Sequence, residues 1–273
     1  MKDSRLDSIK AEFLDIYNAI RDLSDDEILN GSDVIFRPHF ERLNRLAAMD
    51  VADDAAEKLL RDRELHSVIK HISHLKRING LRMEIECARS IVADPEPWTL
   101  LKGFVYYPNY LKLAQMECKG ANLKERDRVV FLGSGPLPMS LISLWKQYGI
   151  EGIGIEQIPE YAELSKSLVD TLGLTGHIHI IEGNHFSLPL HEECRLVMVG
   201  ADALPKDEIF AYLARALPNG TRLSYRIYEK GLRRLLDVQS VFHIPPGFKE
   251  HLRIRPEPPV NNTSVFLIRN TGL

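Results

Sequence analysis

The sequence predicts an α/β protein in which a bundle of helices precedes a doubly wound parallel sheet. Up to about residue 120 the apolar residues follow helical spacing, and no strand pattern is convincing. Beyond that point short apolar runs alternate with helical stretches, as in parallel sheets. We therefore predict a helical domain over residues 1–120 and a sheet domain over residues 121–273.

The first domain begins with an apolar stripe at steps of three and four residues, formed by Leu6, Ile9, Phe13, Ile16 and Ile20. We expect further helices over residues 41–49, 55–63 and 65–92. Pro95 and Pro97 should end the last of these, because proline cannot continue a helix. One more helix is predicted after Pro108, which completes a helical bundle.

The second domain shows five short apolar runs that we interpret as buried parallel strands, at 128–132, 153–156, 177–181, 196–199 and 221–225. Helices are predicted between them at 139–148, 159–172 and 206–217. The last two runs, 251–255 and 263–268, have no helix between them. We expect them to form an antiparallel pair at one edge of the sheet.

Composition restricts the class of protein. The formal net charge is −3, which argues against a nucleic-acid partner because such proteins usually carry a basic surface. Three separated cysteines suit a reducing cytoplasm without disulfides, and we expect a cytoplasmic protein. We see no signal peptide and no membrane span, so no membrane partner is expected.

The turn after the first predicted strand has the features of a nucleotide site. Gly133, Ser134, Gly135 and Pro136 separate that strand from a helix, and glycine allows the backbone to turn sharply close to a ligand. Glu156 ends the next strand, where a carboxylate is placed to bind ribose hydroxyls. The sheet domain is therefore predicted to be Rossmann-like, although an ordinary strand–helix turn would also use these glycines.

The turn departs from the dinucleotide fingerprint, since Pro138 occupies the place of the third glycine. S-adenosylmethionine has no pyrophosphate and does not require that close approach of the helix. We therefore favour it as the nucleotide over NAD or FAD. Asn184, which follows the third strand, could then bind the edge of the adenine.

Several segments resemble the nicotianamine synthase family, in particular its archaeal and bacterial members. The glycine turn reads Gly-Ser-Gly-Pro-Leu-Pro, and similar segments are Trp98–Leu100, Tyr107–Leu111, Asn261–Val265, Gly80–Glu84 and Tyr225–Tyr228. The similarity extends from about residue 75 to the end of the chain. It implies a sheet of the class I methyltransferase type, and an enzyme that moves the 3-amino-3-carboxypropyl (aminobutanoyl) group of S-adenosylmethionine to an amine, releasing methylthioadenosine. The products of such enzymes are metal chelators.

The resemblance also implies roles for particular residues. Glu84 would be the base or proton relay, with Tyr110 holding or relaying the proton, and the helical domain would cover the site as a lid. Tyr107 and Asn262 would bind the substrate. A solvated helix surface is the alternative for Glu84, and Glu86 is a second possible base.

Arg226 lies at the end of the fifth predicted strand, the end at which α/β sheets bind ligands. Its guanidinium could hold a substrate carboxylate through two parallel hydrogen bonds. A surface ion pair is the competing interpretation. For metals, His71 and His74 share a helix face, but without a third ligand we predict no metal site.

Three functions remain open from the sequence. The leading one is aminobutanoyl transfer to an amino acid, with histidine as in the opine-type metallophores slightly favoured over glutamate or a second S-adenosylmethionine. An ordinary methyltransferase and a nucleotide-sensing module without turnover are the others. A small amino-acid substrate is expected as partner, and a homodimer is the commonest default.

Overall fold

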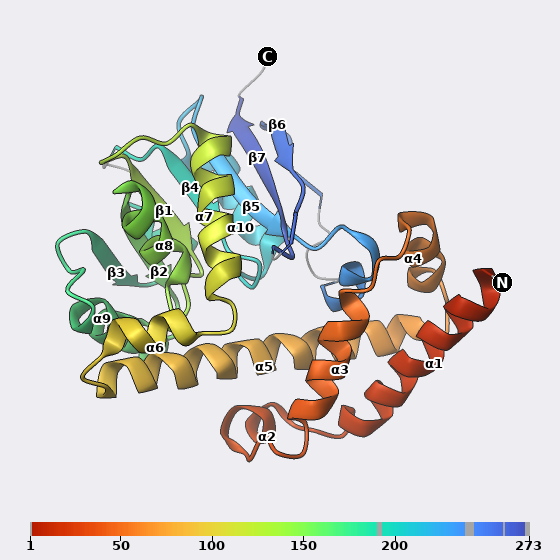
Figure 1. Cartoon of the computed structure of the whole chain (residues 1–273). Helices are drawn as coiled ribbons and strands as arrows, with labels where there is room; N and C mark the ends of the chain where they lie inside the picture. The colour runs from red at the N-terminus through yellow and green to blue at the C-terminus, as the bar shows by residue number, and fades with distance from the viewer. Residues whose placement is uncertain (1, 190–192, 238–242, 259, 271–273) are drawn as a thin grey trace. The chain divides into compact units, whose positions relative to one another are not determined.

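The computed structural model of the chain describes residues 2–189, 193–237, 243–258 and 260–270 (Figure 1). It divides into two compact units, each built from two stretches of chain. The first consists of Met1–Met83 with Tyr228–Ser240, and the second of Glu84–Ile227 with Val241–Leu273. Each unit is described separately below.

The α-helices are α1 Lys2–Ile20, α2 Asp25–Asn30, α3 Arg37–Ala47, α4 Asp53–Leu60, α5 Leu65–Ala93, α6 Pro97–Gly103, α7 Tyr107–Ala121, α8 Met139–Tyr148, α9 Pro159–Thr171 and α10 Lys206–Ala216. The strands are β1 Arg128–Leu132, β2 Glu151–Glu156, β3 Ile178–Glu182, β4 Leu196–Val199, β5 Arg222–Ile227, β6 Phe248–Ile254 and β7 Thr263–Arg269. Two 3-10 helices, η1 His185–Ser187 and η2 Gly231–Leu236, complete the described elements.

The first unit is helical and has its own apolar core. The predicted stripe on α1 is buried there, and Phe40 and Leu43 of α3 pack into the same core. Leu232 and Leu235 of η2, from the returning stretch, also belong to it. The core of this unit therefore depends on residues that are more than 130 positions later in the sequence than α5.

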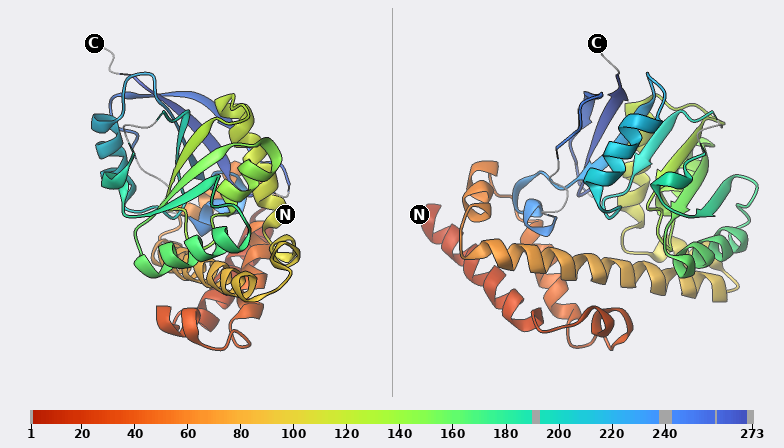
Figure 2. Two further views of the ribbon diagram at one scale, coloured as in Figure 1. Left: turned by 90° about the vertical axis from the view of Figure 1, so that its left-hand side faces the viewer. Right: turned by 180° about the vertical axis from the view of Figure 1, so that it is seen from behind.

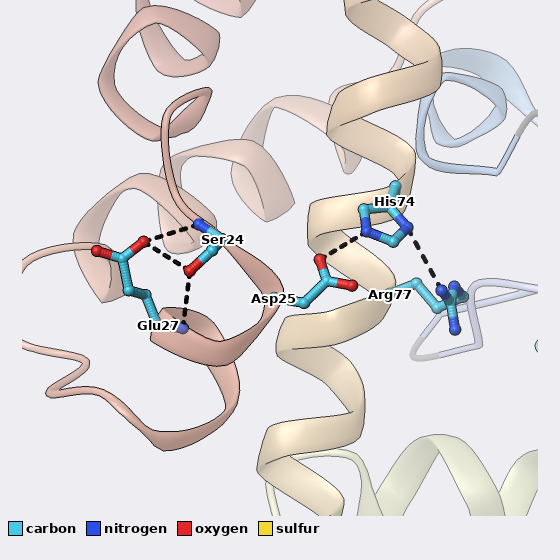
Figure 3. Close-up of polar contacts among 5 residues, drawn as sticks. All are labelled: Ser24, Asp25, Glu27, His74 and Arg77. Carbon is cyan, nitrogen blue, oxygen red and sulfur yellow. Dashed lines mark hydrogen bonds and ion pairs between the residues drawn. The ribbon is translucent and has the colours of Figure 1, made fainter.

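A capping box begins α2. The Ser24 hydroxyl accepts a hydrogen bond from the Glu27 amide, and the Glu27 carboxylate accepts one from the Ser24 amide (Figure 3). The neighbouring Asp25 carboxylate lies 2.7 Å from Nε2 of His74 on α5. His74, one of the two histidines that share a face of this helix, is therefore paired with α2.

The second unit contains one mixed sheet with the strand order β3-β2-β1-β4-β5-β7-β6. The pairs β3–β2, β2–β1, β1–β4 and β4–β5 are parallel, whereas β7 is antiparallel to both β5 and β6. Figure 2 shows α10 on one face of this sheet and α7 with α8 on the opposite face. The predicted parallel core and the antiparallel pair at its edge are both confirmed.

Successive residues of each strand place their side chains on opposite faces of the sheet. On β5, Leu223 and Tyr225 pack in the core that includes Phe210 of α10. Ser224 and Arg226 therefore face α7 and α8. This alternation places a buried charged residue, Arg226, on the helix-covered side of the sheet.

The division into compact units differs from the predicted boundary at residue 120. Helix α7, expected in the bundle, packs on the sheet, where Gly120 lies against the ring of Phe266 on β7. The division falls within α5, between Met83 and Glu84. The sequence did not indicate this, because α7 has the same helical spacing whether it covers a bundle or a sheet.

Candidate functional site

The turn between β1 and α8 has the backbone that its glycines predict. Gly133 and Gly135 have φ angles of +73° and +72°, a region that costs other residues energy. The amides of Gly133 and Ser134 both donate to the Ile155 carbonyl, at 2.9 and 3.2 Å. These hydrogen bonds fix the turn at the end of β2.

Glu156 is only 6% exposed and is held by the turn itself. Its Oε2 accepts a hydrogen bond from the Gly135 amide at 3.0 Å, and its Oε1 accepts one from the Ile158 amide at 2.9 Å. Each carboxylate oxygen has two acceptor positions, so a further acceptor position remains on both for a ligand hydroxyl. The geometry suits the predicted ribose-binding role and fixes the orientation of the carboxylate.

Glu84 and Tyr110 come together next to the same turn. The Tyr110 hydroxyl donates to Glu84 Oε1 at 3.1 Å, which joins α5 to α7. Glu84 Oε2 lies so close to Gly135 that a Cβ added there would be 3.1 Å from it. Glu86 is exposed, whereas Glu84 is half-buried, so the structure favours Glu84 as the residue that faces the turn.

Cys87 lies one helical turn beyond Glu84 on α5. Burial, with a smaller contribution from the negative charge of Glu84, raises the pKa of its thiol to about 11. The thiol is therefore protonated at neutral pH and adds no charge beside Glu84.

Asn184 follows β3. It lies close to Glu156, the last residue of β2, because the Gly183 amide donates to the Glu156 carbonyl at 2.9 Å. The Asn184 Oδ1 accepts a hydrogen bond from the Phe186 amide at 2.9 Å and begins η1. Its side-chain oxygen is thus engaged, and its NH2 group is the part that can donate to a base edge.

Arg226 is 6% exposed and forms an ion pair with Glu117, which is fully buried on α7. Arg226 Nε lies 3.3 Å from Glu117 Oε1, and Arg226 Nη1 donates to the Ser140 hydroxyl at 2.9 Å. The surface ion pair weighed from the sequence is therefore wrong: the pair is buried. The predicted two-bond grip on a ligand can no longer include Nε, since Glu117 occupies that donor.

Sequence reasoning missed Glu117, and with it Ser264 of β7, whose hydroxyl donates to Glu117 Oε1 at 3.2 Å. One signal was available, because Glu117 is seven residues after Tyr110 and so shares its helix face. Within the described part of the chain, Glu117 Oε2 and Arg226 Nη2 are buried without a hydrogen-bond partner. Each such atom costs about 1–3 kcal/mol when nothing pairs with it.

The two remaining predicted substrate residues lie in the same compact unit. Tyr107 begins α7, and the Lys146 ammonium lies 6.0 Å from its ring centroid and 4.2 Å from that of Trp98. Asn262 is buried immediately before β7. Its neighbour Asn261 donates its amide to the Asn109 side chain at 3.2 Å, which joins this loop to the start of α7.

Among the residues that the structure describes, no group of three or more His, Cys, Asp or Glu side chains is arranged to hold a metal ion. Among the helices that the structure describes, none combines the length and the apolar character needed to cross a bilayer.

The strand order, the antiparallel β7 and the glycine turn with its buried glutamate define a Rossmann-like domain of the class I methyltransferase type. A family model described as nicotianamine synthase protein matches residues 2–272. The chain therefore belongs to the nicotianamine synthase family, which confirms the resemblance noted in the sequence.

Solved structures of MtNAS are similar over nearly the whole chain. A Glu→Gln variant in complex with S-adenosylmethionine is 26% identical, with a TM-score of 0.85, and the match covers 95% of this chain and 97% of that one. MtNAS in complex with MTA and tNA is 26% identical, with a TM-score of 0.81 and 97% of each chain covered. A search of curated protein sequences found no match.

Proposed function

We propose that this protein transfers the 3-amino-3-carboxypropyl group of S-adenosylmethionine to the amine of an amino acid and releases methylthioadenosine. The family and the MtNAS complexes support the co-substrate and the class of reaction. The observation that carries the proposal is the Tyr110–Glu84 pair, which lies directly against the glycine turn.

The chemistry requires a nitrogen, a carbon and a sulfur in line. The amine lone pair forms the new C–N bond, while the C–S bond breaks and its electron pair stays on sulfur as a neutral thioether. Which of the three carbons on the sulfonium reacts depends on which one lies opposite the amine at near-attack distance. The positions of the residues around the turn therefore decide between this transfer and methyl transfer.

A proton must also leave the amine, because an ammonium group has no lone pair. Glu84 is the residue placed to accept it, and Tyr110 holds Glu84 Oε1 so that Oε2 remains toward the turn. The part of α5 from Glu84 onward, together with α6 and α7, would act as a cover that keeps water from the sulfonium. We propose this role for residues 84–121, which belong to the same compact unit as the sheet.

The acceptor is proposed to be an amino acid, with histidine favoured slightly and glutamate, as in nicotianamine-type synthesis, as the alternative. The test is to incubate the protein with S-adenosylmethionine and single amino acids, and to identify the products by mass spectrometry. We expect methylthioadenosine and an acceptor that is heavier by one aminocarboxypropyl group. Release of S-adenosylhomocysteine would instead establish a methyltransferase, and binding without turnover would point to a sensing module.

A further inference from the structure

A buried lysine occupies the first position of α10. Lys206 is only 3% exposed, and its ammonium donates hydrogen bonds to three backbone carbonyls. These belong to Gly200, Ala201 and Ala203, at 3.0, 2.7 and 3.2 Å. A cation at this end of a helix is unfavourable, because the helix dipole places partial positive charge there. The lysine therefore serves the loop that precedes the helix, the β4–α10 loop of residues 200–205, and not the helix itself.

The β4–α10 loop lies where an open parallel sheet binds its ligand. In the order β3-β2-β1-β4-β5, the chain proceeds outward from β1 in one direction and from β4 in the other. The helices that follow these two strands, α8 and α10, cover opposite faces of the sheet (Figure 2). Ligands of such sheets bind outside the carboxyl ends of the two strands at which the order reverses. The glycine turn follows one of these strands, and the β4–α10 loop follows the other.

The loop and the glycine turn are in direct contact. The Gly200 amide donates to the Leu132 carbonyl at 2.9 Å. A Cβ added to Gly133 would lie 2.9 Å from the Cβ of Ala203, and one added to Gly200 would lie 3.0 Å from the Gly133 carbonyl oxygen. Because Ala203 packs directly on Gly133, the position of the loop limits the positions that the turn can adopt.

The ammonium also sets the orientation of peptide groups in the loop. In a trans peptide, the C=O and the N–H that follows it point in opposite directions. The carbonyls of Gly200 and Ala201 are directed toward Lys206. The amides that share these peptide groups, those of Ala201 and Asp202, are therefore directed away from it. Two consecutive N–H donors beside the glycine turn suit the acceptor atoms of a nucleoside.

We infer that Lys206 is a positioning residue for the nucleoside part of S-adenosylmethionine, an inference that rests on the co-substrate site of the proposed function. Its ammonium holds the β4–α10 loop in one conformation before the ligand arrives, so that binding does not have to order the loop. Lys206 acts through the loop and takes no part in proton transfer, which belongs to Glu84 at Gly135. Loss of the ammonium should therefore weaken binding and leave the reaction step nearly unchanged.

The test is Lys206→Met in the full chain, which removes the ammonium and keeps most of the apolar stem. Calorimetry measures the Kd of S-adenosylmethionine and that of methylthioadenosine, which share the adenosine part, and methylthioadenosine release gives kcat and KM. We expect both Kd values and the KM of S-adenosylmethionine to rise at least fivefold. The kcat at saturating S-adenosylmethionine should stay within threefold of the parent value.

The matched control is Phe210→Leu, one helical turn further along α10. Phe210 is fully buried against Tyr225, so its replacement destabilises the same helix without removing a hydrogen bond from the loop. Both Kd values should stay within twofold of the parent protein. The comparison separates the position of the loop from the stability of the fold.

Two results would overturn the inference. In one, both Kd values of Lys206→Met stay within twofold of the parent protein; in the other, Phe210→Leu weakens binding as much as Lys206→Met does. Should Lys206→Met not fold, Ala203→Gly removes the methyl group that packs on Gly133 and keeps the lysine. It should raise both Kd values at least threefold, and no rise would also end the proposal. Failure of the proposed function would appear separately, as a lack of methylthioadenosine from the parent protein, and the two Kd values would still decide the role of Lys206.

Discussion

Gly135 and Glu84 restrict each other at the glycine turn. A positive φ angle already disfavours any other residue at position 135, and a Cβ there would meet Glu84 Oε2 at 3.1 Å. The carboxylate thus occupies the space that a side chain on the turn would fill. Tyr110 holds the other oxygen of Glu84, so the position of the proposed base is fixed from two sides.

Replacing the proposed base should separate binding from turnover. We expect Glu84→Gln to keep affinity for S-adenosylmethionine within a few-fold, because the amide has nearly the same shape, and to lose most transfer activity. A fall of about 10²–10⁴-fold in kcat is typical for loss of a general base. Calorimetry and methylthioadenosine release measure the two properties, with Glu86→Gln as the control on the same helix. Near-normal turnover of Glu84→Gln would refute the role.

The neighbouring thiol should report on the same site through its pKa. Because burial raises the pKa of Cys87 to about 11, its thiolate is scarce at pH 8, and alkylation should be slow and accelerate up to about pH 11. The charge of Glu84 contributes to this pKa, so Glu84→Gln should move the profile of Cys87 toward lower pH. Mass spectrometry of peptides after timed iodoacetamide treatment checks this. A rapid reaction at pH 8 in the folded protein would contradict it.

Residue types with strong positional preferences were predictable from sequence. The two glycines and Glu156 occupy a turn and a strand end, where local backbone geometry dictates the residue. Glu117 was not predictable in this way, because a glutamate in a helix is usually solvated and its burial depends on Arg226, more than 100 positions away. Only the folded sheet reveals that pair.

Helix α7 depends on a close approach to β7. A Cβ on Gly120 would lie 2.1 Å from the buried ring of Phe266, so Gly120→Ala should force the helix or the ring to move. We expect a loss of about 1–3 kcal/mol in the free energy of unfolding, as is usual for overpacking. Gly103→Ala on α6 has open space around it and should be neutral or slightly stabilising. Urea unfolding compares the two, and equal stability would disprove the packing argument.

The elements that were missed are short. Helix α2 has six residues and α6 has seven, too few to show two full turns of apolar periodicity. The sequence predicts Pro97 as a helix breaker, whereas in the structure it occupies the first position of α6, where proline needs no hydrogen-bond partner. The longer elements were found within a few residues, and β1, β4 and α8 were found with their observed bounds.

At the scale of the whole molecule, the first compact unit is not one continuous stretch. Leu232 is fully buried in its core, although the residue lies between β5 and β6 in the sequence. Leu232→Ala should cost about 2–5 kcal/mol and should increase amide hydrogen exchange in α1 and α3 more than in β1 and β4. Exchange measured by mass spectrometry tests this, and an increase confined to the sheet would contradict the assignment.

The order of the strands was predictable only in part. Alternation of strands and helices indicates a parallel sheet. The lack of a helix between the last two strands indicates that they form an antiparallel pair at the edge of the sheet. The insertion of β7 between β5 and β6 is a long-range pairing that no local pattern encodes. The same is true of η2, whose leucines are buried in the core of the first unit although they lie far along the chain from the rest of that core.

Each compact unit is built from two separate stretches of the chain, and this affects any attempt to express the sheet-containing unit alone. A gene fragment starting at codon 121 would omit α7, and so would lack both Tyr110 and the partner of Arg226. A fragment that starts at codon 84 keeps both. However, its codons 228–240 would encode leucines that no longer have the apolar core of the first unit to pack against, and exposed leucines promote aggregation. A soluble miniature of this enzyme would need a short polar bridge in place of that stretch.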